Sequence, residues 1–508
     1  MSKNFLSLIS QSIDSYPNKA ALNITSNSTA TSCTYAELGS IIAGTQRNLV
    51  REGFKAGDRA IVLFPPSIEL YGTILAMVGL GCVPVFVDTS MPFSKITWSI
   101  ENAGAKALMT GARFRAILSI NATARKLKFY RFNSKGVDKR IVSTSPDSLI
   151  INEDVGSCLI TYTSGSTGNP KAADRTHYSL IQQSLALSKE IAEVPERPDD
   201  ATLVCFPVAL LQCLCTGSTG ILPAINLRKP GLFDPKRVLN QITDNQVTIL
   251  GGSSAFLERL CDHIVSTKQQ EKTSNIRMVF CGGAPVGQRL AKKMTLAFPE
   301  PKTIVIYGST EAEPISHSHC SEYLCHSQSK GLLVGSHVSN EVDLVISDPG
   351  ADSEENILNE QKETDAIGEI YVMGNHVLQS YINPADNIGT KIQGSKGVWH
   401  ATGDRAYFDD EGLLWLVGRT KDIITHRGKE FDVYALEHSL ELLAGVDRAA
   451  VVQTKNGAAA FFTGDPSATG AVSKLCREYG LDIGLSHIKK MPVDGRHNSK
   501  IDRKKLSS

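Results

Sequence analysis

The stretch Tyr162-Thr-Ser-Gly-Ser-Thr-Gly-Asn-Pro-Lys171 combines hydroxyl groups, glycines and a closing lysine. It directly follows the apolar run Cys158-Leu-Ile-Thr-Tyr162, which predicts a buried strand that ends where the polar loop begins. Backbone and side-chain donors in such a loop can surround a polyphosphate, and Lys171 supplies the opposite charge. The stretch is not a Walker A loop, because Asn169 and Pro170 interrupt the required Gly-Lys-Ser/Thr succession. We predict a phosphate-binding loop of another kind; for this stretch alone, a flexible surface loop is the alternative.

Further short motifs follow this loop in a fixed order. A strand-like run, Ile304-Val-Ile-Tyr307, leads into Gly308-Ser-Thr-Glu311. Thr402-Gly-Asp404 and Gly418-Arg-Thr-Lys-Asp422 come next, and Asn498-Ser-Lys500 lies near the C-terminus. Each motif is weak by itself, but the ordered set is specific.

Together these motifs resemble the adenylate-forming superfamily, which includes acyl-CoA synthetases, stand-alone adenylation domains and luciferases. The resemblance extends over nearly the whole chain, from Thr34-Tyr-Ala-Glu37 to Lys500. It implies an enzyme that uses ATP and Mg²⁺ to convert a carboxylic acid into an acyl-adenylate, with release of pyrophosphate. The partner implied is a small-molecule carboxylic acid, with coenzyme A as a second substrate in many members.

The resemblance also assigns roles. Lys500 would bridge the substrate carboxylate and the α-phosphate as negative charge develops there, and Glu311 would bind Mg²⁺. A solvated basic tail is the alternative for Lys500, since Lys504 and Lys505 are close by. The phosphates would be held by Thr163, Ser164, Gly165, Ser166, Thr167, Gly168 and Lys171. The rest of the nucleotide would contact Gly282, Gly283, Ala284, Pro285, Tyr307, Gly308, Ser309, Thr310, Asp404 and Arg419.

Two of these roles have a simple chemical basis. Paired glycines at Gly282 and Gly283 let the backbone approach a flat base, on which Tyr307 can stack. Asp404 can accept hydrogen bonds from both ribose hydroxyls. The sequence departs from the family pattern just after Lys171, where Ala172 and Ala173 replace the usual glycine and Asp174 adds a negative charge.

Length and composition limit the classes of protein. A chain of 508 residues predicts two or more domains. With a net charge of +1, there is no electrostatic case for binding nucleic acid or an anionic membrane. Residues 1–9 alternate polar and apolar side chains, which favours an amphipathic helix over a signal peptide. The most apolar stretch, Leu203–Ile225, is interrupted by Pro207 and Gln212, so we expect a cytoplasmic protein without a membrane span.

The order of strand-like and helix-like segments predicts the fold class. Near-continuous apolar strands alternate with helical patterns such as Tyr35–Arg51, which indicates α/β architecture with parallel-rich sheets covered by helices. We expect an N-terminal AMP-binding domain over residues 1–419 and a small, mobile α+β domain over residues 420–508 that carries Lys500. By resemblance, Lys421 is the hinge between them.

The cysteines and histidines do not require a metal. Eleven scattered cysteines fit reduced thiols better than a disulfide framework. His317, His319, Cys320, Cys325 and His326 have a spacing that permits a metal site, but no matching second half follows. We therefore favour a locally polar loop there.

The second half-reaction is left open by the sequence. After the hinge, Thr425–Glu430 contains one glycine, where coenzyme A ligases have a glycine-rich face. The segment Pro492–Leu506 resembles the C-terminal signature of β-lactone synthetases from olefin pathways and of related fatty-acid ligases. We therefore expect a fatty or β-hydroxy fatty acid as substrate, which then forms a coenzyme A thioester or an intramolecular β-lactone. The apolar stretch Val204–Ile225 could line an acyl channel or belong to the core.

Two other readings are retained. An enzyme that loads a carrier protein would need an acidic residue for a substrate amine, and Cys205–Leu214 contains none. An acyl carrier or a pathway enzyme that delivers the acid is a further partner to consider. A degenerate nucleotide-binding relative is opposed by the presence of Lys171, Glu311, Asp404 and Lys500, and is favoured by the departures after Lys171.

Overall fold

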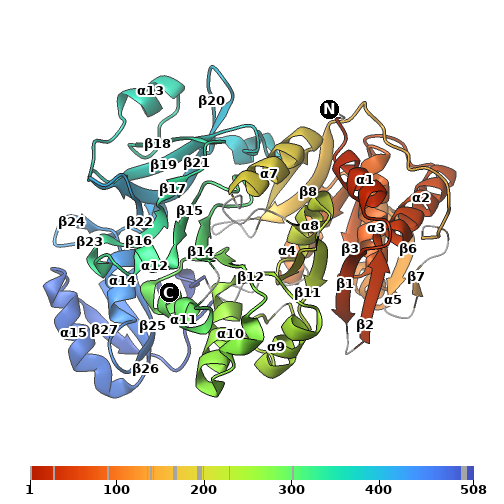
Figure 1. Cartoon of the computed structure of the whole chain (residues 1–508). Coiled ribbons are helices and arrows are strands. Elements are labelled where there is room, and N and C mark those ends of the chain that lie inside the picture. The colour runs from red at the N-terminus through yellow and green to blue at the C-terminus, as the bar shows by residue number, and fades with distance from the viewer. Residues whose placement is uncertain are drawn as a thin grey trace.

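The structure is a computed structural model in which strands and helices alternate along most of the chain. It describes residues 3–26, 29–87, 91–133, 136–137, 140, 142–163, 169–190, 197, 199–227, 229–299, 302–493 and 500–507. Within these residues the strands form sheets of nine, seven, six, three and two strands. The predicted fold class is confirmed, because a large N-terminal α/β part precedes a small α+β C-terminal part (Figure 1).

The seven-stranded sheet runs in the order β7-β6-β5-β3-β4-β8-β9 and is parallel except at its two edge pairs. Successive residues face opposite cores: Ala60 and Val62 pack on one side, Ile61 and Leu63 on the other. Its strands are β3 (Arg59–Leu63), β4 (Val83–Phe86), β5 (Ala107–Thr110), β6 (Lys128–Asn133), β7 (Gly136–Val137), β8 (Ser157–Thr163) and β9 (Lys171–Thr176). The helices beside it are α2 (Tyr35–Arg51), α3 (Ile68–Gly79), α4 (Phe93–Asn102), α5 (Ala112–Leu118), α6 (Ala122–Lys126) and α7 (His177–Glu190).

The nine-stranded sheet runs in the order β17-β15-β14-β13-β12-β10-β11-β1-β2, with antiparallel pairs only toward its ends. Its strands are β1 (Ala20–Ser26), β2 (Thr29–Thr34), β10 (Ala201–Val204), β11 (Thr219–Leu222), β12 (Ile249–Ser253), β13 (Met278–Gly282), β14 (Lys302–Tyr307), β15 (Ser316–His319) and β17 (His337–Val338). Its helices are α1 (Leu6–Ser15), α8 (Leu210–Thr216), α9 (Pro235–Asp244), α10 (Ser254–Thr267), α11 (Gln288–Ala297) and α12 (Cys320–Tyr323). The carboxyl ends of β13 and β14 lie side by side, as adjacent parallel strands require.

The remaining elements complete the fold. The six-stranded sheet holds β16 (Leu332–Gly335), β18 (Asp343–Ser347), β19 (Gly368–Met373), β20 (Lys391–Gln393), β21 (Val398–Phe408) and β22 (Leu414–Arg419), with α13 (Glu354–Asn359). The C-terminal segment, residues 420–508, holds β23 (Ile424–His426), β24 (Lys429–Phe431), α14 (Tyr434–Leu440), β25 (Val446–Thr454), β26 (Gly457–Gly464), α15 (Thr469–Glu478), β27 (Gly484–His487) and α16 (Lys504–Ser507). Figure 1 shows this segment (blue) beside α11 (green).

The N-terminal helix differs from its prediction. It begins at Leu6, so residues 3–5 precede it rather than forming its first turn. The amide of Asn4 donates to the backbone carbonyls of Val78, Gly79 and Asn152, and its Oδ1 accepts from Leu6 N. Asn4 therefore ties the chain to α3 before the helix starts. Within the described residues no helix is long and apolar enough to span a bilayer.

A buried carboxylate anchors the six-stranded sheet. Asp409 is 3% exposed, accepts hydrogen bonds from Leu413 N (2.9 Å) and Trp415 Nε1 (2.8 Å), and pairs with Lys330 Nζ at 2.8 Å. Burial alone would raise the pKa of Asp409, but Lys330 and these hydrogen bonds hold the pKa below its ordinary value. The ionised form of Asp409 is therefore the form that stabilises the fold.

We expect Asp409→Asn to lower the free energy of unfolding by about 2–3 kcal/mol, because it leaves buried donors and Lys330 without the carboxylate charge. A carboxyl with a lowered folded-state pKa stabilises above its unfolded pKa, and that stability is lost as the pH falls through the folded value. The difference between wild type and variant should therefore shrink below about pH 4. Urea unfolding at several pH values measures it, and a difference that stays constant into acid would contradict this role.

Candidate active site

A cleft of about 4170 Å³ opens at the carboxyl ends of β13 and β14. Side chains from the seven-, nine- and six-stranded sheets and from the C-terminal segment line it. The predicted site residues on its wall are Lys171, Gly282, Gly283, Ala284, Pro285, Tyr307, Gly308, Ser309, Thr310, Glu311, Asp404, Arg419, Lys421 and Lys500. Residues more than 300 positions apart in the chain therefore line one cleft.

The predicted phosphate loop connects β8 and β9. Thr163 ends β8 and stands opposite Lys171, the first residue of β9, in an antiparallel pair. The predicted residues Ser164, Gly165, Ser166, Thr167 and Gly168 lie outside the described residues. Lys171 Nζ donates to the carbonyl of Asp386 at 3.3 Å and lies 5.0 Å from the centre of the Tyr381 ring.

Tyr307, Asp404 and Arg419 form a connected group. Tyr307 ends β14, and its hydroxyl donates to Asp404 Oδ2 at 2.9 Å. Arg419 Nε lies 2.7 Å from Asp404 Oδ1 as an ion pair, and Arg419 Nη2 donates to Thr402 O at 3.1 Å. The Asp404 charge raises the pKa of Arg419, and burial followed by Asp404 raises that of Tyr307. Asp404 is thus held in place by a cation and a phenol before any ligand binds.

Glu311 lies in the turn after β14. Its backbone carbonyl accepts from Leu378 N at 2.7 Å, and its Oε1 accepts from the Tyr381 hydroxyl at 2.7 Å. Burial alone would raise the pKa of Glu311, but His400, the Tyr381 hydrogen bond and Lys391, in that order, keep the pKa below its ordinary value. Glu311 is therefore ionised at neutral pH and oriented by Tyr381.

Three residues that act on Glu311 were not predicted from the sequence, namely Tyr381, Lys391 and His400. Lys171 and Lys391 both lie over the ring of Tyr381, and Lys391 Nζ is 5.7 Å from the ring centre. Lys391 donates to Leu378 O, and burial lowers the pKa of Lys391 to about 7. Burial, followed by the charge of Lys391, lowers the pKa of His400 to about 3, so its imidazole is neutral. Its Nδ1 donates to Thr390 O at 3.1 Å. None of these residues stands in a sequence motif, so no local pattern identifies them.

The donor set at Glu311 fits Mg²⁺ that is shared with a nucleotide. Among the described residues no group of three or more Asp, Glu, His or Cys side chains is arranged to hold a metal alone. Mg²⁺ is commonly bound by one or two carboxylates together with substrate phosphates and water. An ionised Glu311 on the cleft wall supplies one such carboxylate.

The predicted metal alternative receives no support from the described residues. The rings of His317 and His319 contact each other edge to face at 5.7 Å, and His326 packs on Trp415 at 5.5 Å. Cys320 is buried, whereas Cys325 is exposed. These side chains do not converge as a ligand set in the described structure.

Lys421 and Lys500 reach the cleft from the C-terminal segment. Lys421 lies in the single turn η5 (Thr420–Asp422) directly after Arg419. Burial, followed by the charge of Arg419, lowers the pKa of Lys421 to about 8. Lys500 is exposed and precedes the isolated bridge that pairs Ile501 with Val493.

One wall of the cleft is apolar. Phe206, Pro207 and Val208 line it where β10 ends, and the Tyr71 hydroxyl donates to Pro207 O at 2.7 Å. The same wall includes Leu70, Ile74, Leu211, Leu222, Pro223 and Ile225. Much of the predicted apolar stretch Val204–Ile225 therefore serves as both cleft wall and core.

The chain is similar to known proteins over most of its length. The profile of the AMP-binding enzyme family matches residues 9–382. The olefin beta-lactone synthetase of Xanthomonas campestris pv. campestris is 26% identical over 93% of this chain and 90% of its own. The feruloyl-CoA synthase of Amycolatopsis sp. is 27% identical over 83% of this chain and 80% of its own.

Solved structures share the fold. ATP-bound MatB from Rhodopseudomonas palustris matches with a TM-score of 0.83 at 21% identity, covering 100% of this chain and 98% of that chain. The o-succinylbenzoate CoA synthetase MenE from Bacillus subtilis, in complex with the acyl-adenylate intermediate OSB-AMP, matches with a TM-score of 0.79 at 21% identity, covering 99% and 98%. Both likenesses extend over the C-terminal segment as well as the large sheets.

Proposed function

Because the chain belongs to the AMP-binding enzyme family, we propose that it activates a carboxylic acid with ATP to form an acyl-adenylate. The observation that carries this proposal is the meeting of Lys171, Tyr307, Glu311, Asp404 and Lys500 on one cleft. These side chains supply cations for phosphates, an acceptor for a ribose and a carboxylate for a metal. The adjoining apolar wall offers space for the acid.

The reaction brings two anions together. A carboxylate oxygen of the acid attacks the α-phosphorus of ATP, the bond from that phosphorus to the bridging oxygen breaks, and pyrophosphate leaves. Lys500 bridges the carboxylate and the α-phosphate, and Lys171 balances charge on the leaving pyrophosphate. Thr163 and the residues after it add hydrogen bonds to the β- and γ-phosphates. Glu311 would hold Mg²⁺, which would supply further charge neutralisation at the phosphates.

The rest of the nucleotide contacts the ends of β13 and β14 and strand β21. The loop Gly282–Pro285 borders the adenine, with Gly283 at φ +81°, which a side chain would disfavour. Asp404 accepts from the ribose hydroxyls, assisted by Arg419. Lys421 acts as the hinge between a domain of residues 1–419 and one of residues 420–508.

We propose a fatty or β-hydroxy fatty acid as substrate, in keeping with the apolar wall around Phe206 and Ile74. Two second steps have specific support. Intramolecular β-lactone formation is favoured because the β-lactone synthetase similarity covers 93% of this chain and 90% of that protein. Transfer to coenzyme A is favoured by the similarity to feruloyl-CoA synthase.

Pyrophosphate release across a panel of free acids, with and without coenzyme A, tests this proposal when it is combined with mass spectrometry of the products. A dehydrated, thiol-independent product from a β-hydroxy acid identifies the lactone route, and an acyl-CoA identifies the ligase route. Release only with a carrier-bound acid would indicate delivery by an acyl carrier. ATP binding without pyrophosphate release for any free or carrier-bound acid would contradict the proposal and favour a nucleotide-binding protein.

Asp404→Asn is expected to raise the KM for ATP by about 10- to 100-fold with a smaller change in kcat, because a charged acceptor of two hydrogen bonds is weakened. Steady-state kinetics with ATP, 2′-deoxy-ATP and 3′-deoxy-ATP measure this effect. Wild-type protein should discriminate against both deoxynucleotides, and the variant should lose most of that discrimination. Equal discrimination by the two proteins would place the ribose elsewhere.

A further inference from the structure

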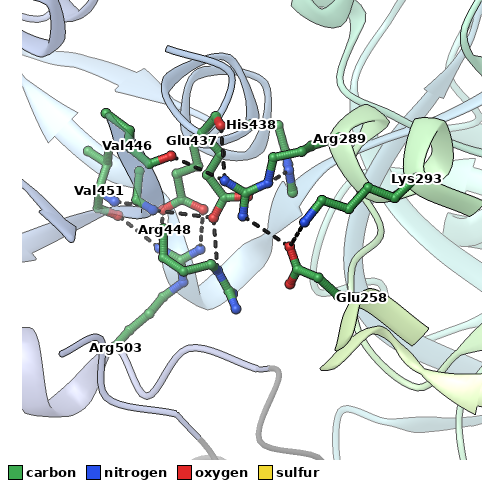
Figure 2. A network of polar contacts seen from close by, with 11 residues as sticks. Glu258, Arg289, Lys293, Glu437, His438, Val446, Arg448, Val451 and Arg503 are labelled. Carbon is green, nitrogen blue, oxygen red and sulfur yellow. Dashed lines mark hydrogen bonds and ion pairs between the residues drawn. The ribbon is translucent and has the colours of Figure 1, made fainter. Parts of the chain in front are cut away.

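Arg289 links the large N-terminal part to the C-terminal segment (Figure 2). It extends from α11, which begins just after the loop Gly282–Pro285. Its Nη1 donates to the backbone carbonyls of Glu441 at 3.2 Å and Val446 at 3.1 Å, and its Nη2 donates to Glu258 Oε1 at 3.5 Å. The first two acceptors lie at the end of α14 and the start of β25. Carbonyls at a helix C-terminus lack partners within the helix, so a guanidinium is well suited to them.

Helix α14 is also tied to the C-terminal stretch that contains Lys500. Glu437 of α14 receives two hydrogen bonds from Arg503, Nη1 to Oε1 at 2.6 Å and Nη2 to Oε2 at 2.7 Å (Figure 2). Arg503 also donates to Val451 O at 2.9 Å and is 14% exposed. Because Arg503 is three residues from Lys500, the Cα of Lys500 lies within about 11 Å of it. Arg289, α14, Glu437 and Arg503 thus form a continuous connection to Lys500.

Helix α14 packs closely against the large N-terminal part. A Cβ placed on Gly287 would lie 2.4 Å from His438 Nδ1. His438 is on α14, and Gly287 is the residue before α11, so the helix rests directly on the end of the predicted adenine-side loop. A small displacement of either element would separate Arg289 from its carbonyl acceptors.

A second contact between the two parts lies near the proposed hinge. Arg405 of β21 binds Asp432 through two hydrogen bonds of 2.8 and 3.2 Å. Arg405 pairs across the sheet with Gly418, next to Arg419, so this contact is close to Lys421. A contact near a rotation axis restrains rotation less than one farther along the rotating part. Arg289 therefore has the larger influence on orientation.

We infer that Arg289 is a positioning residue for acyl-adenylate formation. It holds α14 in the described orientation and thereby keeps Lys500 in the cleft. The inference rests on the proposed function for its kinetic consequence, but the orientation itself does not depend on which acid is used. Misplacement of a catalytic group by about 1 Å can lower a rate by about 100-fold.

Arg289→Ala is the test, with Lys293→Ala as the matched control. Lys293 is on the same helix one turn later and binds the same Glu258 at 3.0 Å, with its second ion pair to Asp262 at 2.8 Å. Arg289→Ala should lower pyrophosphate release by about 10- to 100-fold, and conversion of added synthetic acyl-adenylate should change less than about twofold. Lys293→Ala should change neither rate by more than about twofold. Equal loss in both half-reactions, or an equal response of the two variants, would overturn the inference.

An energy-transfer measurement separates this inference from the proposed function, because it needs only MgATP and no acid. The two dyes are attached at Glu271→Cys and Lys474→Cys, and the exposed Cys325 is replaced by serine. Wild type and Lys293→Ala should show one dominant transfer efficiency, and Arg289→Ala should populate a second. If the distribution of transfer efficiencies for Arg289→Ala were unchanged, the positioning role of Arg289 would be refuted even if acids are activated. A second population would support it even if no acid in the panel reacts.

Gly287→Ala provides a variant that leaves Arg289 in place. Its backbone, at φ −89°, accepts alanine, but the new methyl group would meet His438. The variant should reproduce the energy-transfer change of Arg289→Ala, and His438→Ala in the same protein should reverse it. Failure of the second substitution to restore the distribution would contradict the proposed seat of α14.

Discussion

Replacing Lys500 with alanine is expected to lower acyl-adenylate formation by about 10²–10³-fold, the loss typical for a preorganised charge that acts at the transition state. KM for ATP should change little, because the proposed nucleotide contacts of Asp404 and Lys171 remain. Lys500 lines the same cleft as Glu311 and Tyr307, in keeping with its proposed role. Pyrophosphate release and ATP binding measured on the same protein separate the two effects.

Lys505→Ala is the control for Lys500. Lys505 lies five residues later, is 67% exposed and pairs with Asp502 at 2.8 Å. Exposed ion pairs of this kind contribute little, so its rate should stay within about twofold of wild type. If both lysine variants lost activity to the same degree, the tail would act as a general basic surface and not through one positioned amine.

Glu311→Gln should cause the other large loss. The substitution keeps the shape of the side chain and removes its charge, so we expect a fall of about 10²–10³-fold in pyrophosphate release. The Mg²⁺ concentration needed for half-maximal rate should also rise, since the proposed metal ligand is weakened. A titration of rate against Mg²⁺ at saturating ATP measures both effects.

Tyr381→Phe tests how much the orientation of Glu311 contributes to activity. It removes only the hydroxyl that donates to Glu311 Oε1 and leaves the ring beneath Lys171 and Lys391. We expect a loss of about tenfold, the consequence of one lost hydrogen bond to a charged group. If Glu311→Gln retained the wild-type Mg²⁺ dependence, the metal would be bound by other groups.

Local patterns made parts of the fold predictable. The helix Tyr35–Arg51 was predicted with its observed ends from the helical spacing of its apolar residues, and Thr34 and Glu37 form a reciprocal cap at its start. The strand before Gly308-Ser-Thr-Glu311 was predicted because an apolar run ends abruptly in a polar turn. Signals of this kind lie within a few neighbouring residues, so the sequence displays them directly.

Other parts depend on contacts between distant residues. Tyr381 meets Glu311 across 70 positions, and Arg289 meets Glu441 across 152. Neither Tyr381 nor Arg289 stands in a recognisable motif, and their partners are fixed only when sheets and helices pack. The start of α1 was misplaced for the same reason, because the distant carbonyls of Val78 and Asn152 hold Asn4 outside the helix.

The pairing of Thr163 with Lys171 makes the fold largely independent of the sequence between these two residues. The β8–β9 ladder holds both ends of the intervening sequence at neighbouring points, whatever side chains lie between them. Closing such a connection costs little more free energy when residues are inserted or exchanged. The proposed phosphate-binding sequence can therefore vary while the sheet retains its stability. If this sequence binds phosphates as proposed, substitutions in it should lower activity before they lower the free energy of unfolding.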